Sequence, residues 1–261
     1  MTTRIKFFGV AGYEVVSPDH RILFDPYLVG NPGAPITPEE LEKPDVILVS
    51  HAVWDHMGDA FAIAERTGAP VVGAADVRAL MMDQGLPSDQ VQATIHGIKL
   101  LLNGVVIQTV EAHHWSQATL SDGSVVPGTA LGYVVDVEPG VRIYHWGDSA
   151  FFPGIATIGE FYSPTVAILG CALPNALMAQ VPGPAEILTG AMAPRDAALA
   201  AELLGAQTVI ASHYIEASNP DVGECLEAIG ELDSTGSRVA LAPEPGQVVV
   251  IDGERAWIEA E

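Results

Sequence analysis

Residues 50–59 read SHAVWDHMGD and bring two histidines and an aspartate, His51, Asp55 and His56, into one short segment. They follow residues 45–50, DVILVS, a continuous apolar run of strand length. A run of this kind is typical of a strand buried on both faces of a sheet. Because the polar residues come directly after it, we expect their side chains to lie at one edge of that sheet.

The same placement recurs along the chain. The polar residues that follow apolar strand-like runs are His113 and His114 (after Val105–Glu111), Asp148 (after Val141–Trp146) and His213 (after Thr208–Ser212). A single histidine at a strand end is more often a hydrogen-bonded structural residue than a ligand. Strand ends along one edge gather in one place, however, and neutral imidazole with carboxylate suits zinc, iron or manganese. The joint pattern therefore predicts a metal site with a position open to water.

Short strands and turns dominate the order of elements. The turn at Asn103-Gly104 predicts a hairpin, and the hairpins together predict mixed rather than purely parallel sheets. Helices are expected over Met57–Thr67, over Val77–Gln84 with Asp76 as its cap, and over Pro194–Leu204. This order favours an α+β fold of two mixed sheets packed face to face with helices outside. No linker is evident, so residues 1–261 are interpreted as a single domain.

Composition narrows the classes of partner. The formal charge is −22, which opposes binding to nucleic acid and to anionic membranes and favours a small-molecule substrate. The apolar window 166–181 is too broken to span a bilayer. Two cysteines, Cys171 and Cys225, suggest no disulfide framework and indicate a reducing cytoplasm. Whether the chain forms a homo-oligomer stays open.

The segment 50–59 resembles the His-x-His-x-Asp-His signature of the metallo-β-lactamase superfamily. Later landmarks come in the same order: FDPY (24–27), EAHHWS (111–116), YHWGDS (144–149), AMAP (191–194) and ASHY (211–214). They are most similar to the branch of ascorbate-phosphate-type lactonases and the N-acyl-phosphatidylethanolamine phospholipase D group. The resemblance implies an αββα sandwich, metallo-β-lactamase-like, with two metal positions in a shallow cleft.

The resemblance also implies the ligands. His51 and His114 would serve the first metal, and Asp148 would bridge both metals. The second metal would take Asp55, His56 and His213. His114 is preferred to His113 because its spacing to the following Trp-Ser matches the phospholipase-like members, and because neighbours on a strand face opposite ways.

One departure from the signature concerns the first metal. Val53 occupies the place of the second signature histidine and has no donor atom. We therefore expect one tightly held ion, zinc foremost with manganese or iron as alternatives, and weak or no occupancy of the first position. His96 and His145 are candidate replacement ligands, although each is more readily interpreted as a packed structural histidine.

The function implied is that of a metal-dependent hydrolase that uses a metal-bound hydroxide on a small-molecule lactone, ester or phosphodiester. Asp55 would orient the nucleophile and receive its proton, and His51 and His114 would donate protons or hold the substrate. The alternatives are a metal-binding member that has lost catalysis, a nuclease or phosphodiesterase, and a single-iron redox enzyme. The acidic charge disfavours the nuclease, and the altered first position disfavours the iron enzyme.

Weaker signals surround these residues. Asp25 is expected either to form hydrogen bonds near the site or only to end a strand. Cys171 is interpreted as a residue packed in the core rather than as a nucleophile. The long apolar stretch 171–194 is interpreted as a substrate-lining lid or a dimer contact. Trp54, Trp115 and Ser116 are expected to line the pocket.

Overall fold

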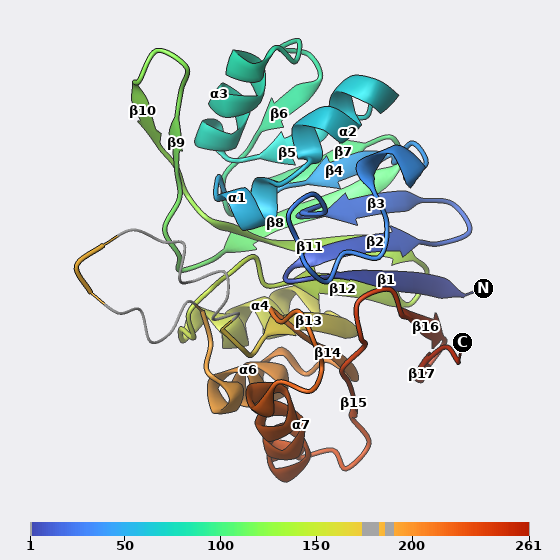
Figure 1. Cartoon of the computed structure of the whole chain (residues 1–261). Helices are drawn as coiled ribbons and strands as arrows, with labels where there is room; N and C mark the ends of the chain where they lie inside the picture. The colour runs from blue at the N-terminus through green and yellow to red at the C-terminus, as the bar shows by residue number, and fades with distance from the viewer. Residues whose placement is uncertain (1, 174–182, 186–190, 261) are drawn as a thin grey trace.

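Two mixed β-sheets form the centre of the molecule in the computed structural model, which describes residues 2–173, 183–185 and 191–260 (Figure 1). The first sheet has the order β17-β16-β1-β2-β3-β4-β5-β6. Its strands are β1 (Thr3–Gly9), β2 (Gly12–Val16), β3 (Arg21–Phe24), β4 (Val46–Leu48), β5 (Val71–Gly73), β6 (Val91–Ala93), β16 (Val248–Asp252) and β17 (Arg255–Ile258). Strands β3 to β6 run parallel to one another, so their carboxyl ends share one edge.

The second sheet has the order β15-β14-β13-β12-β11-β8-β7. Its strands are β7 (Lys99–Leu102), β8 (Val105–Glu111), β11 (Leu131–Glu138), β12 (Val141–His145), β13 (Val166–Gly170), β14 (Thr208–Ser212) and β15 (Val239–Leu241). Strands β12 to β15 are parallel, and β8 shares their direction because β11 is antiparallel to both β8 and β12. A small ribbon of β9 (Gln117–Thr119) and β10 (Val125–Pro127) stands apart from both sheets.

Helices cover the outer faces. The helices are α1 (Trp54–Met57), α2 (Ala60–Thr67), α3 (Ala75–Gln84), α4 (Gly154–Tyr162), α6 (Pro194–Leu204) and α7 (Pro220–Leu232), with a short 3₁₀ turn at Pro38–Glu40. Helices α2 and α3 lie beside the first sheet, and α4, α6 and α7 lie beside the second (Figure 1). The predicted αββα sandwich is thereby confirmed. None of these helices has the length and apolar character needed to cross a membrane, as far as the described residues go.

Alternating side chains build the layers. In β1, Phe7 packs in the core that contains both sheets, whereas its neighbour Phe8 packs in the core beneath α2 and α3. Val72 and Val71 of β5 divide in the same way. Successive side chains of a strand point to opposite faces, so a strand covered on both faces needs apolar residues at every position.

Two predicted helix starts are wrong. The helix expected over Met57–Thr67 is divided: α1 ends at Met57 and α2 begins at Ala60. The break lies at Gly58, which has a φ of 40° and where a Cβ would come within 2.5 Å of the Tyr27 Cα. Asp76 is not a cap, because α3 begins at Ala75 and Asp76 lies inside its first turn, buried beneath the β9–β10 ribbon. Helix α4 and this ribbon had no counterpart among the predicted elements.

Gly147 joins the second sheet to the polar edge. It has a φ of 63°, and a Cβ there would lie 2.0 Å from the carbonyl oxygen of Leu131. Only glycine combines this left-handed conformation with so close a backbone approach. The tight turn after β12 directs the next residue, Asp148, toward the first sheet.

We predict that Gly147→Ala lowers the free energy of unfolding by more than ~2 kcal/mol, because the clash with Leu131 adds to a left-handed backbone cost of about 1–2 kcal/mol. Gly205→Ala is the matched control. Its φ is 65°, but no described atom lies within 4 Å of the added Cβ. Urea denaturation of both variants measures the difference, and equal losses would contradict the close-approach argument.

Candidate metal centre

Four strand ends deliver the polar side chains to one edge of the sandwich. His51 follows β4, and Asp55 and His56 lie in the adjoining single turn α1. The other contributions come from the second sheet: His114 after β8, Asp148 after β12 and His213 after β14. Because these strands of the second sheet share one direction, their carboxyl ends meet, and the two facing sheets bring both groups together.

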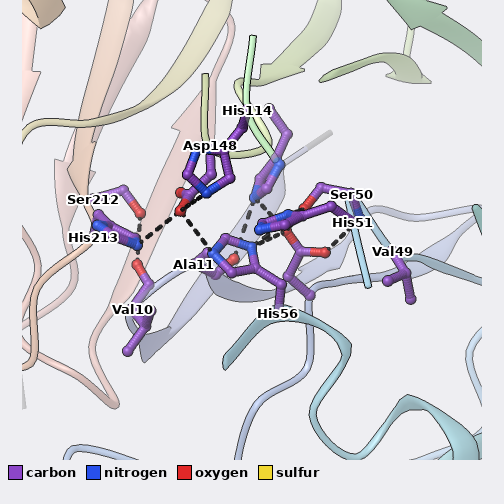
Figure 2. A network of polar contacts seen from close by, with 12 residues as sticks. Val10, Ala11, Val49, Ser50, His51, His56, His114, Asp148, Ser212 and His213 are labelled. Atoms are coloured by element: carbon purple, nitrogen blue, oxygen red, sulfur yellow. Dashed lines mark hydrogen bonds and ion pairs between the residues drawn. The ribbon is translucent and has the colours of Figure 1, made fainter. Parts of the chain in front are cut away.

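Asp148 is the centre of the cluster (Figure 2). Its Oδ2 lies 3.2 Å from Nε2 of His56, 3.2 Å from Nε2 of His213 and 3.9 Å from Nε2 of His114. Two overlapping groups have ligand atoms within 4.8 Å of one another: His51, His56 and Asp148, and Asp55, His56 and His213. All six residues predicted from the sequence therefore converge.

The donor set fits a cation. The buried atoms His56 Nε2, His213 Nε2 and Asp148 Oδ1 have no hydrogen bond of acceptable geometry with any described group. The two nitrogens lie 3.2 Å from Asp148 Oδ2, but neither contact has the geometry of a hydrogen bond. Ligands at 2.0–2.2 Å from a tetrahedral zinc lie roughly 3.3–3.6 Å apart, close to the separations here. A cation shared by these buried nitrogen and oxygen atoms would supply the partner that each of them lacks.

Outer hydrogen bonds orient the imidazoles. His56 Nδ1 donates to Asp25 Oδ2 at 2.8 Å, and His213 Nδ1 donates to the Ala172 carbonyl at 2.9 Å. The Ser50 hydroxyl donates to Asp25 at 2.7 Å, so His51 Nδ1, 2.8 Å from that hydroxyl, is a donor to it. In the neutral form of each ring, with the proton on Nδ1, Nε2 is the lone-pair nitrogen that a metal requires.

The backbone at the site is unusual. Asp148, His213 and Asp25 all have positive φ, of 51°, 69° and 41°. Left-handed conformations cost free energy in non-glycine residues and persist where the surrounding structure imposes them. The His213 N–H donates to the Val10 carbonyl at 2.7 Å, which ties the first sheet to the second beside the cluster.

Residues 20–214 match the family described as "Beta-lactamase superfamily domain". A UPF0173 metal-dependent hydrolase of Thermococcus onnurineus is 37% identical over 81% of this chain and 84% of its own. A UPF0173 metal-dependent hydrolase of Rubrobacter xylanophilus is 35% identical over 81% of each. The chain belongs to the UPF0173 metal-dependent hydrolases of the β-lactamase superfamily.

A solved structure supports the same conclusion for this UPF0173 hydrolase. Igni18, a metallo hydrolase of the archaeon Ignicoccus hospitalis, superposes with a TM-score of 0.74 at 26% identity. The match covers 97% of this chain and 99% of Igni18. The similarity to the metallo-β-lactamase superfamily inferred from the sequence is thus confirmed, and the chain is a metal-dependent hydrolase. The finer branch suggested by the landmarks stays a prediction.

Charge is divided unevenly among the cluster residues. Burial and then the neighbouring His56 lower the pKa of His51 well below its usual value. Burial opposes a charge on His56 too, but Asp148 and Asp25 outweigh it and raise its pKa well above the usual value. Asp148 likewise outweighs burial and raises the pKa of His213. In turn His213 and His56 outweigh the burial of Asp148 and hold its pKa well below the usual range.

Several histidines and Cys171 lie outside the cluster. His113 faces outward, with Nε2 2.8 Å from Glu111 and its ring stacked on Phe152, so the geometry favours His114 as the predicted ligand. His145 is buried against Phe24 and lies 3.2 Å from the Ala11 carbonyl, and His96 is exposed. Among the residues that the structure describes, neither belongs to a group of closely spaced ligand atoms.

The interaction with the neighbouring Cys225 thiol, and then burial, raise the pKa of the Cys171 thiol, so a packing role fits its surroundings better than a nucleophilic one. The lid or dimer contact expected at 171–194 lies mostly outside the described residues.

The supporting roles of two residues, Ser50 and Asp76, were not predicted from the sequence. Ser50 links Asp25 to His51, and its signal was only a polar residue at the end of an apolar strand. Asp76 was noticed for its place near a helix start, but it accepts a hydrogen bond from the Ser116 hydroxyl. Ser116 in turn accepts from the Ala52 N–H at 3.1 Å, so α3 holds together the two loops that contain His51 and His114.

We predict that zinc binding releases protons and weakens as the pH falls. The raised pKa values of His56 and His213 keep these rings protonated into the neutral range, so a cation has to displace their protons. Affinity should fall roughly tenfold per pH unit for each proton displaced. Titration calorimetry in buffers of different ionisation enthalpy counts the protons. Binding at neutral pH without proton release would contradict the assignment of these two ligands.

Proposed function

We propose that this hydrolase cleaves a small-molecule lactone, ester or phosphodiester with the help of one tightly bound metal ion, zinc being the ion that the donor set suits best. The convergence of His56, Asp148 and His213, with Asp55 beside them, carries the proposal. These four residues would hold the ion. When bound, zinc would acidify a coordinated water and polarise the carbonyl or phosphoryl oxygen of the substrate.

The protein's own groups supply the remaining chemistry. Asp55, only 8% exposed and within reach of His56 and His213, orients the attacking water and accepts its proton. Asp25 keeps the Nδ1 proton of His56 in place, which leaves Nε2 free for the cation. The walls of the sandwich exclude bulk water from these groups, since all of them are buried.

His51 and His114 have a different role in this proposal. In the position that resembles the first metal site, Val53 stands where a third imidazole would be needed, so these two histidines hold no tightly bound ion. His114 is the more accessible of the pair, with its side chain 23% exposed. Burial lowers the pKa of His114, so its ring is neutral at physiological pH. A neutral ring can donate a hydrogen bond to the substrate through one nitrogen and accept one through the other.

A nucleic-acid substrate is the weaker alternative. With a formal charge of −22, the protein repels a phosphate backbone. A small molecule that reaches the cluster through a local opening does not face this long-range repulsion to the same degree. We therefore place phosphodiesters of small molecules, but not nucleic acids, within the proposed range.

We predict that the zinc-loaded protein hydrolyses at least one member of a panel of lactones, esters and phosphodiesters, and that chelation abolishes turnover. Asp148→Ala should lose both the ion and at least about 10³-fold in kcat/KM, since it removes the central ligand. Asp136→Ala is the control, because Asp136 is 41% exposed and pairs with Arg142 on β12. Stoichiometric metal without turnover on any panel member would favour a metal-binding protein that has lost catalysis.

We predict that the wild-type chain binds one ion and that Val53→His raises the stoichiometry toward two, because it adds an imidazole beside His51 and His114. Val53→Leu is the control for altered packing without a donor atom. Elemental analysis of metal per chain after dialysis measures both. A value of one for Val53→His, or of two for the wild type, would show the proposed ligand assignment to be wrong.

A further inference from the structure

A cleft of about 620 Å³ lies directly beside the metal centre. Residues 52–54, which separate His51 from Asp55, form one wall, and Trp115, the neighbour of His114, contributes to another. Helix α3 and strand β9 complete the lining through Leu80 and Gln117. The cleft falls within the range of roughly 300–1,000 Å³ that is usual for small-molecule sites.

None of the six cluster residues lines the cleft. A substrate whose reacting bond lies at the cluster would therefore place a different, non-reacting part in the cleft. Binding energy from such a remote part of a substrate can be used to orient the reacting bond. The cleft is thus suited to select the group attached to the reacting bond rather than to perform the chemistry.

The lining carries no charge, and most of its large side chains are apolar. Val53, Trp54, Met57, Leu80 and Trp115 belong to it. Two of them are large aromatic side chains that the fold leaves exposed to solvent, Trp54 by 41% and Trp115 by 58%. An apolar group that covered these indoles would gain the free energy of removing both surfaces from water.

The polar side chains of the cleft carry no charge. Gln84, Gln117 and Thr119 are the polar members, and no Asp, Glu, Lys or Arg is found among the described residues that line it. A carboxylate or phosphate in this cleft would lose water without gaining an opposite charge. The occupant that complements this surface is therefore a neutral apolar group, with the amides and the hydroxyl to accept or donate hydrogen bonds at its rim.

The walls are held in place before any ligand arrives. The Trp54 ring packs edge-to-face on Tyr27 at a centroid distance of 5.4 Å. The hydrogen bonds from Ala52 to Ser116 and from Ser116 to Asp76 join the wall of residues 52–54 to the loop that carries Trp115. A preformed cleft spends little binding energy on ordering its side chains.

We propose that this cleft binds an uncharged aromatic or branched apolar group of the substrate, and that the physiological substrate is accordingly a neutral ester or lactone bearing such a group rather than a phosphodiester. Val53 has a role here in addition to its proposed consequence for metal binding, since it is one of the apolar residues that line the cleft. The choice of reaction in this inference rests on the proposed function. The binding of the apolar group rests on the cleft alone.

The first test measures binding without turnover. 2-Naphthylacetamide, an uncharged probe with no ester to cleave, is titrated into the zinc-loaded protein by calorimetry, with acetamide as the probe lacking the apolar group. We expect only the naphthyl compound to bind, and Trp115→Ala to weaken its binding roughly tenfold. Trp257→Ala is the matched control, because Trp257 is likewise a partly exposed tryptophan, at 41% against 58% for Trp115, but lies on β17, outside the cleft. Equal affinities of the two variants for the probe would overturn the proposal.

The second test measures selectivity. Ethyl 2-naphthylacetate and monoethyl succinate present the same kind of ester with a neutral aromatic and an anionic acyl group. We expect the wild-type kcat/KM to favour the naphthyl ester at least tenfold, and Trp115→Ala to remove most of this preference in kcat/KM. A preference for the anionic ester would contradict the cleft assignment. Absence of turnover on every ester would instead contradict the proposed hydrolysis, while the calorimetric result would still decide the cleft.

Discussion

The buried carboxylate of Asp148 is the group on which the arrangement of the site depends. It lies at equal distance from an imidazole of the first sheet's edge, His56, and one of the second sheet's edge, His213. A charge buried this deeply is tolerated only when opposite charges or a cation compensate it. The two sheets are therefore joined at their shared edge by electrostatics as well as by the apolar core between them.

Support for this centre comes from outside the ligand set. Asp25, at the end of β3, accepts from His56, from the Ser50 hydroxyl and from the Ser50 N–H. On the opposite side, Ala172 and Val10 accept from His213 through its ring and its backbone. The positive backbone angles at Asp25 and His213 are maintained by these bonds, in line with the general tendency of functional sites to store local strain.

Under the proposed function, the departure from the signature at Val53 links metal content to substrate choice. It leaves one metal position without a third imidazole and places an apolar residue in the neighbouring cleft. The two consequences are physically independent, because one concerns donor atoms and the other concerns hydration. In the proposed function, the chemistry of the hydrolase takes place at one group of ligands, and its selectivity resides in the uncharged cleft beside them.

The sequence by itself determined the layers and which polar side chains converge at their shared edge. Apolar runs such as residues 45–50 can be satisfied only by burial on both faces, and polar residues that follow them must gather at the sheet edge. Other features were decided only by tertiary contacts. Gly58 divides the helix expected from Met57 because Tyr27, distant in the chain, occupies the space, and Asp76 bonds to Ser116 because β9 is placed over α3. The local sequence pattern shows whether a segment forms a helix or a strand and whether polar residues follow its end. The partner of a buried polar group and the shape of a cleft depend on which distant segments the fold brings together.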